Sequence, residues 1–140
     1  MKKKIIILGS TGSIGRTTIN IVLKNKNNFD VILLTANKNY VKLLIQAKKL
    51  NCRNIVIFNK ENFFKAKIMN KNKKIKIFNS IKEFLNNHNG KVDYTMCAIT
   101  GISGLMPIIQ ITRITKNLAI ANKESIICGW NLIEKEIVKY

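Results

Sequence analysis

One stretch near the start of the chain indicates the fold: Lys4-Ile5-Ile6-Ile7-Leu8-Gly9-Ser10-Thr11-Gly12-Ser13-Ile14-Gly15. Its short apolar run suits a parallel strand that is covered on both faces. Glycines then recur where the backbone must turn and can approach a ligand. Apolar residues at helical spacing follow over residues 14–23, so the turn ends at a helix N-terminus. Because free N–H groups and the positive end of the helix dipole meet there, the stretch predicts a cradle for a pyrophosphate.

The glycine spacing is a variant of the dinucleotide-binding fingerprint, since Gly9, Gly12 and Gly15 give G-x-x-G-x-x-G in place of G-x-G-x-x-G. A second apolar stretch at residues 31–35 completes a β-α-β pattern. A NAD-binding domain normally has a carboxylate after that strand, but this chain reads Ala36-Asn37-Lys38-Asn39. A cation between two amides can pair with a 2′-phosphate, so the sequence favours NADP over NAD. The alternative is an ordinary exposed turn.

Strand and helix patterns alternate along the rest of the chain. We expect strands at residues 5–8, 31–35, 55–58, 75–78, 94–99 and 118–121, and helices at residues 14–23, 40–50, 61–69, 80–85 and 105–115. Ser80 and Glu83 have the spacing of a capping box at the start of the fourth helix. The alternation predicts an α/β fold of the Rossmann-like, doubly wound type, with a mainly parallel sheet, helices on both faces, and ligands at the carboxyl ends of the strands.

One domain is expected to span residues 1–140. Near its end, Trp130, Ile133, Ile137 and Tyr140 fall on one helical face, and the sequence offers nothing for that face to pack against. No C-cap follows. This pattern suggests a chain that is cut off at Tyr140.

The chain is strongly basic, with a formal net charge of +18. Basic surfaces can bind nucleic acid by releasing counterions from the phosphate backbone. Here the lysines are spread along the chain, aromatic residues are not interleaved with them, and arginine is scarce. We therefore expect attraction to small anions such as phosphorylated substrates, and no nucleic-acid partner. A basic nucleic-acid-binding domain is the alternative.

The three cysteines, Cys52, Cys97 and Cys128, are widely spaced and form no C-x-x-C pair. This pattern indicates neither a disulfide framework nor a zinc site, and it fits a reducing compartment. No apolar run has membrane-spanning length, so we expect no membrane partner. The first strand pattern begins at the N-terminus and leaves no room for a signal or transit peptide. A cytoplasmic location is expected.

A second polar motif, Ala121-Asn122-Lys123-Glu124-Ser125, follows the last expected strand. It places an amide, an ammonium and a carboxylate at the mouth of the sheet. These groups suit a ligand site. They also suit a simple helix start, in which Asn122 caps the helix and Glu124 lies in its positively charged first turn.

Taken in order, the motifs resemble 1-deoxy-D-xylulose 5-phosphate reductoisomerase over all 140 residues. The resemblance rests on residues 9–15, on residues 36–39, on Ala98-Ile99 with Gly101 and Gly104-Leu105, and on residues 121–125. It implies that this part of the enzyme binds NADPH. It also implies rearrangement and reduction of the substrate to 2-C-methyl-D-erythritol 4-phosphate, a step of non-mevalonate isoprenoid synthesis.

The resemblance further implies roles for individual residues. The pyrophosphate would be held by Thr11, Gly12, Ser13 and Ile14; the 2′-phosphate side by Asn37, Lys38 and Asn39; the nicotinamide end by Asn122 and Glu124; and the sugar-phosphate substrate by Lys123. Asn37 stands where the family often has glycine, and asparagine tolerates a left-handed backbone. The family's Mg²⁺ or Mn²⁺ carboxylates, its catalytic domain and its helical C-terminal part are expected beyond this sequence, so no metal ligand or catalytic residue is assigned here. The full-length protein is expected to be a homodimer.

Other protein classes fit the sequence less well. Short-chain dehydrogenases carry T-G-x-x-x-G-x-G and a Tyr-x-x-x-Lys pair, and neither Tyr40 nor Tyr94 has a lysine four residues on. A semialdehyde dehydrogenase needs a nucleophilic cysteine, for which Cys52 beside Arg53 is the weak candidate. A nucleotide-binding fragment without turnover is a further alternative.

Overall fold

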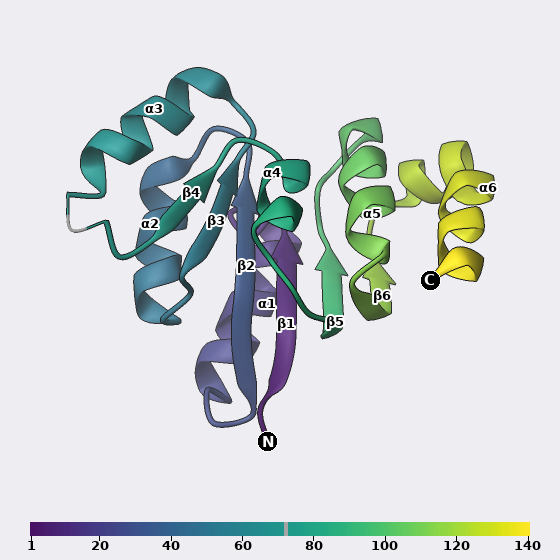
Figure 1. Ribbon diagram of the computed structural model, residues 1–140, viewed down its shortest axis with the longest axis horizontal. Coiled ribbons are helices and arrows are strands. Elements are labelled where there is room, and N and C mark those ends of the chain that lie inside the picture. Colours follow the sequence, from purple (N-terminus) through teal and green to yellow (C-terminus); the bar gives the residue numbers. More distant parts are fainter. Residues whose placement is uncertain (72) are drawn as a thin grey trace.

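The computed structural model describes residues 1–71 and 73–140. Six parallel strands form one sheet in the order β4-β3-β2-β1-β5-β6. The strands are β1 (Lys3–Leu8), β2 (Phe29–Ala36), β3 (Asn54–Ile57), β4 (Lys76–Phe78), β5 (Val92–Cys97) and β6 (Thr115–Ile120). All arrowheads point the same way, so the carboxyl ends of the strands share one edge of the sheet (Figure 1). The predicted α/β fold is confirmed.

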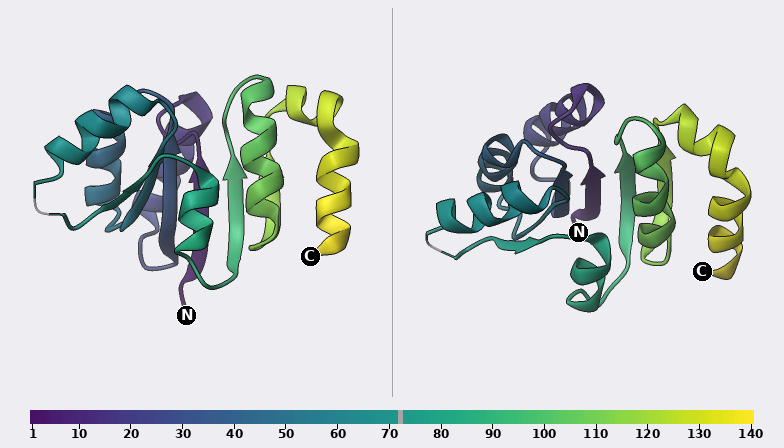
Figure 2. Two further views of the ribbon diagram at one scale, coloured as in Figure 1. Left: turned by 45° about the horizontal axis from the view of Figure 1, so that its top comes forward. Right: turned by 90° about the horizontal axis from the view of Figure 1, so that it is seen from above.

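Helices alternate with the strands and cover both faces of the sheet. They are α1 (Ser13–Lys24), α2 (Tyr40–Lys49), α3 (Lys60–Met69), α4 (Ile81–Asn86), α5 (Leu105–Thr112) and α6 (Lys123–Lys139), with a short 3-10 turn, η1 (Ile102–Gly104). Residues from α1, α2 and α3 share one core with the sheet, and residues from α4, α5 and α6 share another. Figure 2 shows α4 on the opposite side of β1 from α1. No helix within the described ranges is long and apolar enough to span a bilayer.

The first strand explains why its sequence is a continuous apolar run. Ile5 and Ile7 point into the core under α1 and α2, whereas Ile6 and Leu8 point into the core under α4 and α5. All four side chains are buried. Because successive residues of a strand face opposite sides, a strand that is buried on both faces leaves no position exposed to solvent.

The strand order places a topological switch point between β1 and β5. The chain builds outward from β1 through β2, β3 and β4, and then returns to add β5 and β6 on the other side. In open parallel sheets, ligands bind in the crevice that opens at this point, outside the carboxyl ends of the strands. The loops after β1, β2, β5 and β6 are therefore the ones that position a site.

Two expectations near the C-terminus are wrong in detail. The helix expected over residues 105–115 ends at Thr112, because Thr115 already pairs with Val92 in the sheet. The helical face of Trp130, Ile133, Ile137 and Tyr140 was expected to lie unpacked. Trp130, Ile137 and Tyr140 are exposed, as expected, but Ile133 is fully buried in the second core. A close contact allows this burial, since a side chain at Gly129 of α6 would overlap Leu105.

His88, beyond the end of α4, should make stability depend on pH. Its ring stacks on Phe84 with centroids 5.0 Å apart, and no described atom bonds to its buried Nε2. Burial, followed by the charge of Lys4, lowers the pKa of His88 below its ordinary value of 6.5, and a hydrogen bond to the Gly90 backbone opposes this shift. The unfolded chain therefore binds a proton more readily than the folded chain. We expect the free energy of unfolding to be highest, as far as His88 is concerned, above about pH 6.5, and to decrease as the pH falls below that value.

Urea unfolding at about pH 7.5 and about pH 5 measures this effect, because the imidazole of the unfolded chain becomes charged within that range. The matched variant is His88→Gln, which has no titrating ring. Its free energy of unfolding should change less between the two conditions. An identical change in both proteins would show that other groups cause the pH dependence.

Candidate dinucleotide-binding site

The turn after β1 is held tightly against the end of β5. Gly9 has a φ of +77°, which favours glycine, and a Cβ at this position would lie 2.8 Å from the Ala98 carbonyl oxygen. A Cβ at Gly15 would overlap the Gly9 carbonyl oxygen and the Ser10 backbone. Two of the three glycines are therefore required by the fold, because they let α1 and β5 pack directly on the turn.

Gly12 differs from the other two glycines. Its φ of −76° and ψ of 178° are open to any residue, and the nearest atom to a Cβ built there is the Gly9 carbonyl oxygen at 3.5 Å. The backbone of Gly12 is exposed. The fold thus leaves open space over Gly12, and a side chain would fill it. This is the geometry expected where a backbone must approach a pyrophosphate closely.

The start of α1 offers unpaired hydrogen-bond donors around that space. Gly12 is the N-cap and supplies no side-chain cap, and the first turn contains no acidic residue. Within residues 1–71 and 73–140, no acceptor pairs with the N–H groups of Thr11, Ser13 and Ile14. Unpaired N–H groups and the positive end of the helix dipole together favour an anion.

Two buried polar residues hold the turn in place. Thr35 of β2 accepts hydrogen bonds from Gly9 N through Oγ1 (2.9 Å) and from Ser10 N through its carbonyl oxygen (2.9 Å). Gln46 of α2 bonds to the hydroxyl and the carbonyl group of Ser10. Sequence reasoning missed both residues. Gln46 could have been recognised in the sequence, because it is a polar residue beside Ala47 on the face of α2 that packs into the core.

The loop after β2 carries the predicted 2′-phosphate residues, and all three are exposed. Asn39 caps α2 by accepting a hydrogen bond from the backbone N of Lys42 at 3.2 Å. Asn37 O accepts one from Asn59 N at 3.1 Å, which brings the start of α3 beside the loop. Asn37 itself does not use a left-handed backbone, since Asn51 and Lys73 are the non-glycine residues with positive φ in the described ranges.

Lys38 lies close enough to α3 to influence a charge there. The pKa of Glu61, the second residue of α3, is lowered first by its hydrogen bond and ion pair with Lys65 and more weakly by the charge of Lys38. Both Lys38 and Glu61 are exposed. Lys38 is thus a solvated cation at the carboxyl edge of the sheet, free to turn toward an anion.

The motif after β6 has a structural role that the sequence allowed for. Asn122 is buried and caps α6, since its Oδ1 accepts a hydrogen bond from Ser125 N at 3.0 Å. Its Nδ2 donates to the carbonyl oxygens of Ile99 and Gly101, both at 2.6 Å. The side-chain amide has no spare hydrogen. Asn122 therefore ties the start of α6 to the loop after β5, next to the Ala98 carbonyl that contacts Gly9.

Lys123 and Glu124 are exposed in the first turn of α6. The predicted site residues therefore all lie in loops or helix starts that follow β1, β2 and β6, at the carboxyl edge of the sheet. The turn at 9–15 and the loop at 98–104 touch directly. The loop at 37–39 lies between Thr35 and Gln46, which both bond to Ser10. Asn122 connects the last motif to the loop at 98–104.

The two buried cysteines are not suited to act as nucleophiles. Burial raises the pKa of both Cys52 and Cys97 to about 12, so these thiols stay protonated at neutral pH. The suggestion that Arg53 activates Cys52 is wrong, because desolvation of Cys52 outweighs any stabilisation of its thiolate. Among the residues that the structure describes, no group of three or more His, Cys, Asp and Glu side chains converges on a metal position.

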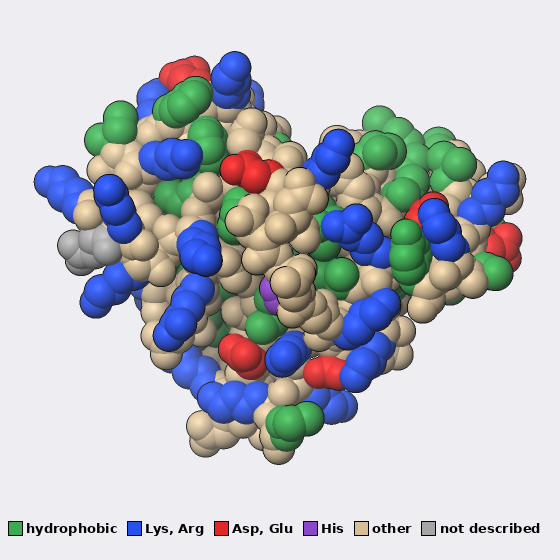
Figure 3. Space-filling view, viewed as in Figure 1, with side chains coloured by type: hydrophobic (Ala, Val, Ile, Leu, Met, Phe, Trp, Pro, Cys, Tyr) green, Lys and Arg blue, Asp and Glu red, His purple; other side chains and the backbone are tan. Residues whose placement is uncertain are grey.

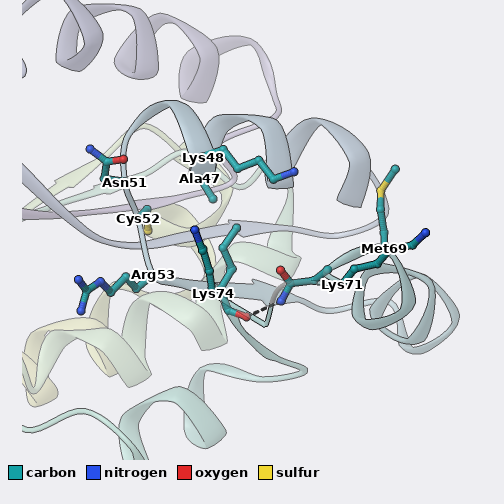
Figure 4. Close-up of a pocket in the computed structure, with 10 residues that line it drawn as sticks. Ala47, Lys48, Asn51, Cys52, Arg53, Met69, Lys71 and Lys74 are labelled. Carbon is teal, nitrogen blue, oxygen red and sulfur yellow. Dashed lines mark hydrogen bonds between the residues drawn. The ribbon is translucent and has the colours of Figure 1, made fainter.

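A basic cavity of about 890 Å³ lies at the other edge of the sheet (Figure 4). It opens between the ends of α2 and α3 and the starts of β3 and β4, and its charged lining residues are Lys48, Arg53, Lys71 and Lys74. The amino ends of parallel strands do not bind the ligand in this fold class. On the face shown in Figure 3, lysines and arginines are scattered among carboxylates and form no continuous stripe.

Comparisons with known proteins agree on one family. The family model for 1-deoxy-D-xylulose 5-phosphate reductoisomerase matches residues 5–129. The reductoisomerase of Pelagibacter ubique (strain HTCC1062) is 49% identical over 140 residues, which is 99% of this chain and 36% of that protein. The reductoisomerase of Wolbachia sp. subsp. Brugia malayi (strain TRS) is 39% identical over 135 residues, 96% of this chain and 35% of that protein.

A solved structure gives the same result. The reductoisomerase from Zymomonas mobilis in complex with NADPH superposes with a TM-score of 0.88 at 29% identity, covering 99% of this chain and 37% of that chain. A reductoisomerase in complex with NADPH, fosmidomycin and magnesium gives a TM-score of 0.84 at 27% identity, covering 98% of this chain and 34% of that chain. The chain thus spans only about a third of the length of the relatives it matches. By sequence and by structure, it belongs to the 1-deoxy-D-xylulose 5-phosphate reductoisomerase family.

Proposed function

We propose that this chain is the NADPH-binding part of a 1-deoxy-D-xylulose 5-phosphate reductoisomerase. The observation that carries the proposal is the open space over Gly12, which is surrounded by unpaired N–H groups at the start of α1. The Zymomonas mobilis relative binds NADPH on the same fold. Isothermal titration of the 140-residue chain with NADPH and with NADH tests the proposal, and NADPH should bind more tightly.

In this proposal each loop at the carboxyl edge holds one part of the cofactor or substrate. Thr11, Gly12, Ser13 and Ile14 receive the pyrophosphate, because Gly12 leaves open space and no described acceptor pairs with the N–H groups of the other three. The 2′-phosphate lies against Asn37, Lys38 and Asn39, since these exposed residues include a cation and no carboxylate. The nicotinamide end lies toward Asn122 and Glu124, and Lys123 binds the sugar-phosphate substrate. Asn122 acts there by fixing the loop, because both hydrogens of its amide are already donated to backbone carbonyls.

The proposed reaction is the rearrangement of 1-deoxy-D-xylulose 5-phosphate and its reduction to 2-C-methyl-D-erythritol 4-phosphate. NADPH, when bound, supplies the hydride. The ammonium group of Lys123 would stabilise negative charge that develops on a substrate oxygen, because a fixed cation favours the charged transition state. We assign the divalent metal, Mg²⁺ or Mn²⁺, to a part of the full-length enzyme outside residues 1–140. That enzyme is proposed to be a cytoplasmic homodimer with catalytic and helical C-terminal domains.

Replacing Lys38 with alanine should weaken NADPH binding selectively. A hydrogen bond to a charged group contributes about 1.5–3 kcal/mol, which corresponds to a loss of about tenfold or more in affinity. NADH lacks the 2′-phosphate, so its affinity should stay the same. Isothermal titration of both cofactors measures the two effects.

Lys24→Ala is the matched control, because Lys24 is an equally exposed lysine at the far end of α1. It removes one positive charge without touching the loop after β2. If Lys24→Ala weakens NADPH binding as much as Lys38→Ala does, the effect is one of net charge. If Lys38→Ala changes neither cofactor, Lys38 is only a solvated turn residue.

A further inference from the structure

The side chain of Gln46, on α2, is buried and bonds to the hydroxyl and carbonyl groups of Ser10 in the pyrophosphate turn. Its Oε1 accepts a hydrogen bond from the Ser10 hydroxyl at 2.7 Å, and its Nε2 donates one to the Ser10 carbonyl oxygen at 2.9 Å. Ser10 is fully buried, and Gln46 is 7% exposed. Because a buried amide is costly unless it is hydrogen-bonded, the two residues are held together as a unit.

This pair fixes the direction of the next N–H group. A trans peptide is planar, and its C=O and N–H point in opposite directions. The described part of the chain has no cis peptide bond. Because the carbonyl of Ser10 points inward at Gln46, the N–H of Thr11 in the same peptide plane points away from α2 and out of the core. No described residue accepts a hydrogen bond from that N–H.

Thr35 fixes the preceding part of the turn. It accepts hydrogen bonds from Gly9 N and Ser10 N, so the backbone is attached to β2 immediately before the Ser10 carbonyl is attached to α2. The protein's own hydrogen bonds therefore hold the turn in one conformation. A donor that already points in the right direction loses less entropy when it binds, and preorganisation of this kind raises affinity.

We propose that Gln46 is a positioning residue for the cofactor: it aims the Thr11 N–H at the pyrophosphate without touching NADPH. The inference rests on the NADPH binding proposed above. In this proposal α2 positions residues for two parts of the cofactor. Lys38 and Asn39, on the 2′-phosphate side, directly precede the helix, and Gln46, which orients the pyrophosphate turn, projects from it. The spacing between the 2′-phosphate and the pyrophosphate positions is then set by one rigid helix.

The first test is Gln46→Met, which keeps the length of the side chain and removes both hydrogen bonds. We expect the Kd for NADPH to rise about tenfold, the size of one lost hydrogen bond to a charged group. In the absence of NADPH, amide NMR should show a shifted Thr11 signal. The matched control is Leu44→Val, a buried residue of the same helix that makes no hydrogen bond to the turn. It should lower the melting temperature and leave the Kd unchanged.

Gln46→Glu provides a second test with a pH profile. A neutral carboxyl group can accept from the Ser10 hydroxyl and donate to the Ser10 carbonyl, whereas a carboxylate cannot donate and repels that oxygen. The affinity of Gln46→Glu for NADP⁺ should therefore approach that of the unmodified chain as the pH falls. A pH profile parallel to that of the unmodified chain would argue against the proposal.

Two further results would overturn it: an unchanged Kd in Gln46→Met, or a loss no larger than in a Leu44→Val protein of equal stability. The failure of the proposed function has a different signature, since the unmodified chain would then not bind NADPH at all. In that case the ligand-free Thr11 amide signal still decides whether Gln46 directs this N–H, and an unshifted signal would refute the inference.

Discussion

Replacing Gly12 with valine should abolish NADPH binding and leave the fold intact. The backbone of Gly12 has dihedral angles that valine can adopt, and a Cβ there meets only the Gly9 carbonyl oxygen, at 3.5 Å. The cost to folding is about 1 kcal/mol, because valine is a poorer N-cap than glycine. In contrast, the two γ-methyl groups would fill the space that the pyrophosphate needs. Isothermal titration should show no measurable heat of binding, while the circular dichroism spectrum stays unchanged.

Gly15→Val is the matched control for this prediction. It introduces the same side chain three residues later, where the new atoms would overlap the Gly9 carbonyl oxygen and the Ser10 backbone. We expect this variant to lose the packing of α1 on the turn and to unfold at a much lower temperature. Unchanged NADPH affinity in a folded Gly12→Val protein would remove the phosphate-cradle interpretation. Unfolding of Gly12→Val would show that the glycine is structural.

Much of the fold could be predicted because its signals are local. The apolar run of β1 reports burial on both faces, and the side chains of Ile5, Ile6, Ile7 and Leu8 are all buried. One half of the predicted capping box forms: Ser80 Oγ accepts a hydrogen bond from Glu83 N at 3.1 Å. The Glu83 carboxylate reaches Asn79 N at 2.8 Å, one residue before the position expected for a capping box. Helix and strand periods depend on nearest neighbours along the chain, so one sequence suffices.

The parts that escaped prediction depend on contacts between distant segments. Thr35 and Gln46 contact the turn from 25 and 36 residues away, and no local pattern marks either as a partner of Ser10. The start of β6 was placed three residues late, because Thr115 looks helical in sequence but pairs with Val92 across the sheet. Cys52 beside Arg53 suggested reactivity, and burial decided otherwise.

The candidate site was predictable in position but not in the division of roles. Three motifs that lie far apart in sequence were expected at one edge of the sheet, and the contacts between the loops bring them there. The sequence could not separate Gly12, which leaves space for a ligand, from Gly9 and Gly15, which the packing requires. It also left two roles open for Asn122, and the structure shows the capping role.

The 140-residue chain should bind NADPH but should not turn over 1-deoxy-D-xylulose 5-phosphate, with or without Mg²⁺ or Mn²⁺. Hard divalent cations need several oxygen ligands that converge on one point. The described carboxylates do not converge, since no metal-binding group of three is present among them. Asp93 is engaged by Lys116 at 2.9 Å and by Lys4 N at 2.9 Å, and Glu61 is paired with Lys65. Without a cation to polarise the substrate oxygens, the rearrangement lacks its electrophile.

The absorbance of NADPH, followed at saturating substrate, metal and protein, measures this directly. A full-length relative such as the Pelagibacter ubique enzyme, which is 49% identical over this region, serves as the positive control under the same conditions. A chimera that joins residues 1–140 to the remainder of that relative should show metal-dependent oxidation of NADPH, because it joins the proposed cofactor site to the part of the enzyme to which we assign the metal. Metal-dependent oxidation by the 140-residue chain alone would place the catalytic centre within it. A chimera that folds and binds NADPH but does not oxidise it would show that the cofactor is not held in a productive position.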